Sequence, residues 1–114
     1  MRLKFGVRLE GLQPQTVVGM MIASVVCQRW GVECVITSCN DGKHSERSWH
    51  YKGFAFDIRT RFPELDGREA EFASDIRGAL GPDFDVVLEA VGTPNEHLHI
   101  EYDPKPINSL EVVQ

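Results

Sequence analysis

Four side chains that can bind a metal or move a proton stand in two clusters of the sequence. His50 and Asp57 lie seven residues apart, and Gly53 between them allows a tight backbone turn. Glu96 and His99 lie three residues apart near the C-terminus. Two imidazoles, a carboxylate and a spare carboxylate match the needs of a catalytic zinc site, which keeps one position open for water and places a base beside it.

Taken singly, these residues also fit ordinary structural roles. Asp57 could face solvent from a strand or pair with a neighbouring basic residue. His97 and His99 share one face of a strand and could be two exposed imidazoles at a sheet edge. The combination favours a metal, because His50, Asp57 and His99 form a two-histidine, one-carboxylate set that zinc accepts with water as the fourth ligand.

Glu96 is the candidate general base. It stands at the start of a predicted strand, where a turn can bring its carboxylate toward the site. The sequence suggests no structural role for it, because no helix begins there and no basic residue adjoins it. The alternative is an inert site closed by Cys39 as a fourth ligand, but Cys39 lies in a separate part of the polar stretch before His50.

Alternation and helical spacing predict the elements that would position these residues. We predict strands over residues 3–9, 32–37, 54–60, 84–90 and 97–102, helices over 14–29 and 67–80, and an irregular tail over 103–114. This order is typical of a single α+β domain, with an antiparallel sheet packed against two main helices and the zinc site at the sheet face. In strand 54–60, Phe56 and Ile58 should face the core, and Asp57 and Arg59 the opposite side.

The first helix has clear boundary signals. Pro14 stands near its start, where proline is tolerated, and Gly31 is a typical residue at a helix C-terminus. The apolar run inside the helix is too short to span a bilayer and predicts a buried helix. The residues expected to face the core are Val17, Val18, Met21, Val25 and Cys27.

Length and charge narrow the class of protein. A chain of 114 residues fits one domain, which we expect to be a monomer. Its net charge of −5 argues against binding to nucleic acid or to an anionic membrane. Cys27, Cys34 and Cys39 include no CxxC pair and predict reduced thiols. Residues 1–5 lack the apolar run of a signal peptide, so we expect synthesis in the cytoplasm.

The two clusters together resemble a known family. The patterns Ser48-x-His50-x-x-Gly53-x-Ala55-x-Asp57 and Glu96-x-x-His99 are similar to those of the LAS-type zinc peptidases. This family includes D-Ala-D-Ala carboxypeptidases, L-alanyl-D-glutamate endopeptidases and many phage endolysins, and the Hedgehog signalling domain shares its fold. The resemblance covers residues 35 to about 104.

The resemblance implies a role for each motif residue. His50, Asp57 and His99 match the zinc ligands, and Glu96 matches the catalytic base. Ser48 matches a serine that hydrogen-bonds within the site loop. His97 resembles a second histidine that lies near the site in many members without binding the metal, and it could help to stabilise the oxyanion.

One departure from the family concerns a positive charge. Members usually carry an arginine shortly after the strand before the motif, and residues 37–44 contain none. Lys43 is the first candidate to replace it, and Arg47 is the second. Because lysine is a point charge and not a bidentate fork, its hold on a carboxylate would differ. Carboxypeptidase and endopeptidase action therefore both stay open.

The function implied by the resemblance is that of a hydrolase of the cell wall. The chain would be a metallopeptidase with one zinc ion that cuts an amide bond in peptidoglycan stem peptides. It would be a phage- or prophage-type enzyme, acting on the wall after release or carried by a virion. The alternative is a non-catalytic zinc-binding module of the same fold, for example a virion structural component. Glu96 separates the two, because a structural zinc site needs no base.

Overall fold

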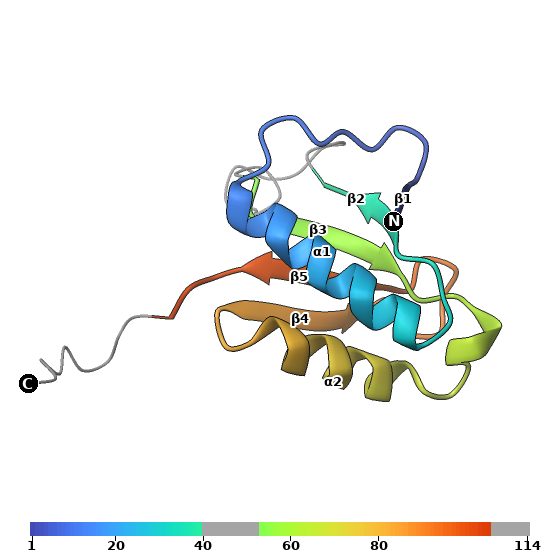
Figure 1. Cartoon of the computed structure of the whole chain (residues 1–114). Coiled ribbons are helices and arrows are strands. Elements are labelled where there is room, and N and C mark those ends of the chain that lie inside the picture. Colours follow the sequence, from blue (N-terminus) through green and yellow to red (C-terminus); the bar gives the residue numbers. More distant parts are fainter. Residues whose placement is uncertain (40–52, 106–114) are drawn as a thin grey trace, which may run out of the picture.

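The described residues form an α+β domain with a five-stranded mixed sheet and two helices, as predicted (Figure 1). The computed structural model describes residues 1–39 and 53–105. Its elements are β1 (Arg2–Leu3), α1 (Pro14–Arg29), β2 (Val35–Ser38), β3 (Ala55–Arg59), a short 3₁₀ turn (Pro63–Leu65), α2 (Glu69–Leu80), β4 (Phe84–Glu89) and β5 (His97–Tyr102).

The strands are arranged in the order β1-β2-β3-β5-β4. Three of the four pairings are antiparallel, whereas β1 and β2 run parallel. The sequence had suggested an antiparallel sheet, but the parallel pair makes the sheet mixed. The cause is the connection: the chain leaves β1, passes through α1 and returns to β2, and a crossover of this kind joins parallel strands.

The first strand is much shorter than its sequence pattern. Alternation predicted a strand over residues 3–9, but only Arg2 and Leu3 pair with β2. The chain then turns, with Gly6 at φ +90° and the amide of Val7 donating to the carbonyl of Lys4 at 3.0 Å.

Both helices cover the same face of the sheet and build the core there (Figure 1). The inward residues of the central strands, Phe56 and Ile58 on β3 and Leu98 and Ile100 on β5, are completely buried against side chains of the helices. The predicted alternation of β3 is thus confirmed. Asp57 and the other residues of the same alternation lie on the sheet face that the helices do not cover.

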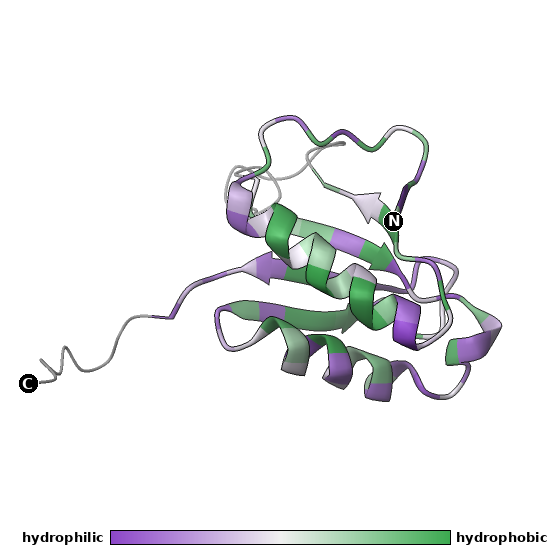
Figure 2. Ribbon diagram, viewed as in Figure 1, coloured by the Kyte–Doolittle hydropathy of each residue, from purple (hydrophilic) through white to green (hydrophobic). Residues whose placement is uncertain are grey.

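The predicted core face of α1 is wrong in phase. Val17, Val18, Met21 and Val25 are 42–59% exposed, and among the expected residues only Cys27 is buried. The buried residues are Thr16, Gly19, Met20, Ala23, Val26 and Cys27. The apolar residues of α1 lie on all sides of the helix, and most of its polar residues lie near its two ends (Figure 2). The hydrophobic period therefore does not fix which side of α1 packs against the sheet. No helix in the described ranges is long and apolar enough to cross a membrane.

Gly19 sets the side of α1 that faces the sheet. A Cβ atom at this position would lie 2.7 Å from Cε1 of Phe84 and 3.5 Å from Cε1 of Phe56. Gly19→Ala should therefore lower the free energy of unfolding by about 1–3 kcal/mol, the usual cost of overpacking, measured by urea denaturation. Gly78→Ala in α2 is the matched control, because a Cβ there meets nothing within 4 Å and alanine favours helix. Equal stability of the two variants would contradict this packing.

The three cysteines are all free and buried, in agreement with the prediction of reduced thiols. Cys27 of α1 and Cys34 before β2 hydrogen-bond to each other, and no disulfide forms among the described residues. This pair ties the end of α1 to the start of β2, so it belongs to the core and not to the polar face of the sheet.

Candidate functional site

Two of the predicted zinc ligands lie side by side on the open face of the sheet. Asp57 of β3 and His99 of β5 are direct cross-strand partners. Nδ1 of His99 lies 3.0 Å from Oδ1 of Asp57. The remaining predicted site residues of the first cluster, His50, Ser48, Lys43 and Arg47, lie outside the described ranges.

His99 is held between two carboxylates. Its Nε2 lies 3.0 Å from Oε1 of Glu101, opposite the contact of Nδ1 with Asp57. The hydrogen bond to Asp57, supported by the charges of Asp57 and Glu89 and by Glu101, raises the pKa of His99 to about 9, against the opposing effect of desolvation. In the metal-free protein the imidazolium therefore bridges both carboxylates at neutral pH, and a metal must displace its proton.

This raised pKa predicts how the stability of the metal-free protein depends on pH. The ordinary pKa of histidine is 6.5, and that of His99 in the fold is about 9. The stabilisation is therefore fully present below pH 6.5 and is lost as the pH rises from 6.5 through 9. Denaturant unfolding in the presence of a chelator should show this fall, and His99→Gln should flatten it. An equally steep fall in His99→Gln would assign it to another group.

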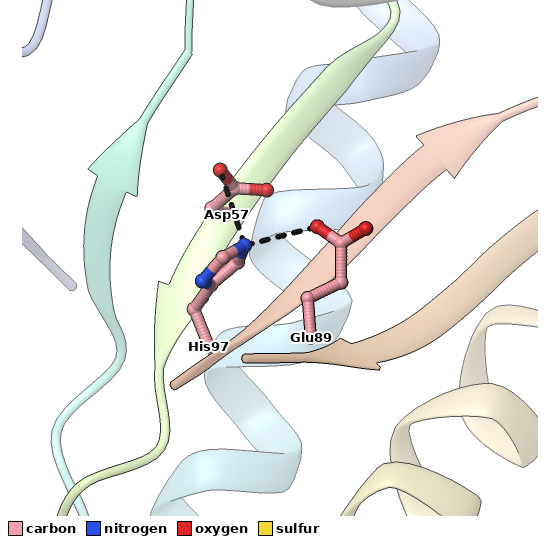
Figure 3. Close-up of side chains that lie close together, drawn as sticks. All are labelled: Asp57, Glu89 and His97. Atoms are coloured by element: carbon pink, nitrogen blue, oxygen red, sulfur yellow. Dashed lines mark hydrogen bonds and ion pairs between the residues drawn. The ribbon is translucent and has the colours of Figure 1, made fainter. Parts of the chain in front are cut away.

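Asp57 belongs to two possible sets of metal ligands. The first set is Asp57 with His99, and the second is Asp57 with Glu89 and His97 (Figure 3). His97 and Glu89 face each other across β5 and β4, with Nε2 of His97 3.0 Å from Oε1 of Glu89 and 3.8 Å from Oδ2 of Asp57. One donor atom from each of the three residues lies within 4.8 Å of the others, so this cluster could hold a metal ion. Nδ1–H of His97 donates to the carbonyl of Asn95 at 2.6 Å, which turns Nε2 toward the carboxylates.

Both donor sets have the chemistry and spacing that zinc accepts. Zinc binds histidine nitrogen and carboxylate oxygen at about 2.0–2.2 Å. Two such ligands at a tetrahedral angle are therefore separated by roughly 3.3 Å. The 3.0 Å separations of His99 from Asp57 and of His97 from Glu89 come close to this value. The separation of His97 from Asp57 is longer, at 3.8 Å. The donor chemistry is compatible with a metal ion, and Asp57 is common to both sets.

Glu96 lies next to the site but has a structural task that the sequence did not reveal. Its Oε1 accepts a hydrogen bond from Oγ1 of Thr60 at 2.7 Å, and its Oε2 accepts one from the amide of Gly92 at 3.0 Å. The expectation that it has no structural role is wrong, because its partners come from the end of β3 and from the turn before β5. These bonds fix its carboxylate at the rim of the sheet face.

Asp57, Glu96 and His97 line one cavity of about 330 Å³. Its other walls include Lys4, Arg59 and Arg61. A larger cavity of about 520 Å³ lies at the end of α1 beside α2, bordered by residues such as Trp30, Arg68 and Asp75. That cavity contains none of the motif residues, so the smaller one is the candidate site.

Four side chains near the motif residues were not predicted from the sequence as members of the site. Glu89, Glu101, Arg59 and Arg61 border the cluster or its cavity. One signal was available for Glu89: strands 84–90 and 97–102 adjoin in sequence, so a hairpin would bring Glu89 near His97, its observed partner. Alternation also placed Arg59 on the same side as Asp57.

Comparison with models of known protein families gives no match, and comparisons with curated proteins and with solved structures give none either.

Proposed function

We propose that the protein is a zinc-dependent peptidase that hydrolyses an amide bond in peptidoglycan stem peptides. The zinc ligands in this proposal are His50, Asp57 and His99, and Glu96 is the general base. The proposal assigns the chain to the LAS-type peptidases and to a cell-wall lytic role of the phage or prophage type.

One observation carries the proposal. Asp57 and His99 are separated by 42 positions in the sequence, yet their side chains meet at 3.0 Å on the open face of the sheet. Glu96 borders the cavity that Asp57 also lines. Asp57 thus lies beside His99 and also lines the cavity that Glu96 borders, which supports the proposed ligand set and base.

The chemistry would divide between the ion and the side chains. Zinc, when bound, would act as a Lewis acid on the scissile carbonyl and lower the pKa of water. Glu96 would take a proton from the attacking water and return it to the leaving amine. Thr60 and Gly92 would keep its carboxylate in one orientation through their two hydrogen bonds. His97 stands beside Asp57, and a contribution to an oxyanion would need a proton on Nε2, the atom that now contacts Glu89.

The direct test is digestion of purified peptidoglycan. The zinc-loaded protein should release peptides that mass spectrometry can identify, and a chelator should stop the release until zinc is restored. The masses of the products separate carboxypeptidase from endopeptidase action. No release from walls of several stem-peptide types would refute the peptidase.

The second candidate is a non-catalytic zinc-binding module. The bonds from Glu96 to Thr60 and Gly92 favour it, because they give this residue a reason to be present without catalysis. Bound zinc without release of any wall peptide would support this candidate.

A further inference from the structure

The candidate cavity has two chemically different sides. One group of lining residues consists of the proposed reaction groups Asp57, Glu96 and His97, and the other, called the cationic side, consists of Lys4, Arg59 and Arg61. Three cations at one small cavity are a notable concentration in a chain of net charge −5. The remaining question is what the cationic side binds.

The fold places these cations beside the reaction groups. Arg59 lies two residues after Asp57 on β3 and pairs in register with His97 of β5. Arg61 follows just beyond the end of β3. Lys4 follows β1, where its amide donates to the carbonyl of Ile36 at 2.9 Å and so fixes the backbone against β2. β3 therefore supplies Asp57 and Arg59 to the cavity, and β5 supplies His97.

None of the three cations is neutralised by an acidic side chain within the described part of the chain. Lys4, Arg59 and Arg61 are exposed and form no ion pair there, although Asp57 and Glu96 line the same cavity. Other arginines are engaged: Arg2 pairs with Glu33, and Arg68 with Glu71. The donors of the cationic side thus stay available for a ligand.

We propose that Arg59 and Arg61, with Lys4 nearby, bind a carboxylate of the substrate, so that the substrate class is an anionic peptide. This inference rests on the proposed peptidase function and deepens it. A guanidinium group binds a carboxylate through two parallel hydrogen bonds, which fixes position and orientation together. Repulsion from Asp57 and Glu96 keeps the ligand carboxylate on the cationic side and directs the neighbouring amide toward the reaction groups.

A stem peptide offers two sources of this carboxylate. One is the C-terminal carboxylate of the final D-alanine, and the other is the α-carboxylate of the γ-linked D-glutamate. Recognition of the first would suit a carboxypeptidase, and recognition of the second would suit an endopeptidase. Four synthetic versions of L-Ala-γ-D-Glu-L-Lys-D-Ala-D-Ala separate them: the acid, its C-terminal amide, its D-isoglutamine form, and the peptide with both changes.

The test measures binding apart from turnover. Calorimetric titration of the four peptides into the zinc-loaded Glu96→Gln protein avoids hydrolysis during the measurement. Arg59→Gln and Arg61→Gln in this background should each weaken binding of the acid by about tenfold to a hundredfold, the usual range for a charge-assisted hydrogen bond. The same substitutions should have little effect on the peptide that lacks the recognised carboxylate.

Arg29→Gln is the matched control, because Arg29 is an exposed arginine at the end of α1 that borders the other cavity. It should leave peptide binding unchanged. Thermal unfolding should be similar in all the arginine variants, since surface substitutions of this kind rarely alter stability.

The outcomes separate this inference from the proposed function. Three results would overturn the carboxylate site. The protein could bind the acid and the peptide with both changes equally, or bind neither peptide, or bind the acid unchanged in the Arg59→Gln, Arg61→Gln double variant. Wall digestion that persists in that double variant with an unchanged KM would overturn the site and leave the peptidase standing. Arginine-dependent binding of the acid without any wall digestion would support the carboxylate site and rule out the peptidase function.

Discussion

Zinc should be lost from the His99→Ala variant and retained by the His97→Ala variant. The proposed ligand set contains His99 and excludes His97, and both histidines lie on the same face of β5 two residues apart. Removing a ligand should weaken zinc binding by more than the roughly tenfold to hundredfold lost with an outer-shell partner. His97→Ala should fall within that smaller range.

Elemental analysis after dialysis and competition with a chelating dye would measure the two effects. The wild type should carry about one zinc ion per chain. The reverse result, with zinc lost from His97→Ala and kept by His99→Ala, would assign the ion to the cluster of Asp57, Glu89 and His97. In that case Glu89→Gln should also lose the metal, and the resemblance to the zinc peptidases would not extend to its ligands.

Glu96→Gln should bind zinc and fold, yet hydrolyse its substrate on the order of a hundredfold to ten-thousandfold more slowly. Glutamine keeps the shape of the side chain and removes its ability to accept a proton. Its carbonyl oxygen can still accept the hydrogen bond from Thr60. Its amide group would then face the Gly92 N–H, where two donors meet, so a small loss of stability is expected as well.

Thr60→Val separates the catalytic role of Glu96 from its structural role. Valine removes the hydroxyl that donates to Glu96 with little change of volume, at a position that is 1% exposed. If Glu96 only stabilises the turn before β5, Thr60→Val and Glu96→Gln should both lower the melting temperature and should have similar residual turnover. Near-wild-type turnover by a folded, zinc-loaded Glu96→Gln protein would rule out Glu96 as the base.

Most of the elements could be predicted because their signals are local. Helix α1 begins at Pro14 and ends two residues before Gly31, as expected from the backbone preferences of these two residues. Strand β5 spans residues 97–102, as predicted, because its alternation of polar and apolar side chains is strict. The placement of Asp57 and His99 on one sheet face also followed from this period of two.

The features that the sequence could not supply depend on contacts between distant segments. The side of α1 that packs is set by the approach of Gly19 to Phe84, 65 positions away in the chain, because apolar residues surround this helix. The structural bonds of Glu96 involve Thr60, which lies 36 positions away. The position of His97 opposite Arg59 depends on the pairing register of β3 and β5, which no local pattern contains.

Strand β5 alternates between the core and the site, and this restricts how the protein can change over evolution. His97 and His99 face the open side, and Leu98 and Ile100 are completely buried. A single-residue insertion or deletion within the strand would exchange the two sets, burying imidazoles and exposing core side chains. Substitutions at the outward positions leave the core intact. New chemistry can therefore arise here by replacement of outward residues, whereas changes of length are confined to the connections between strands.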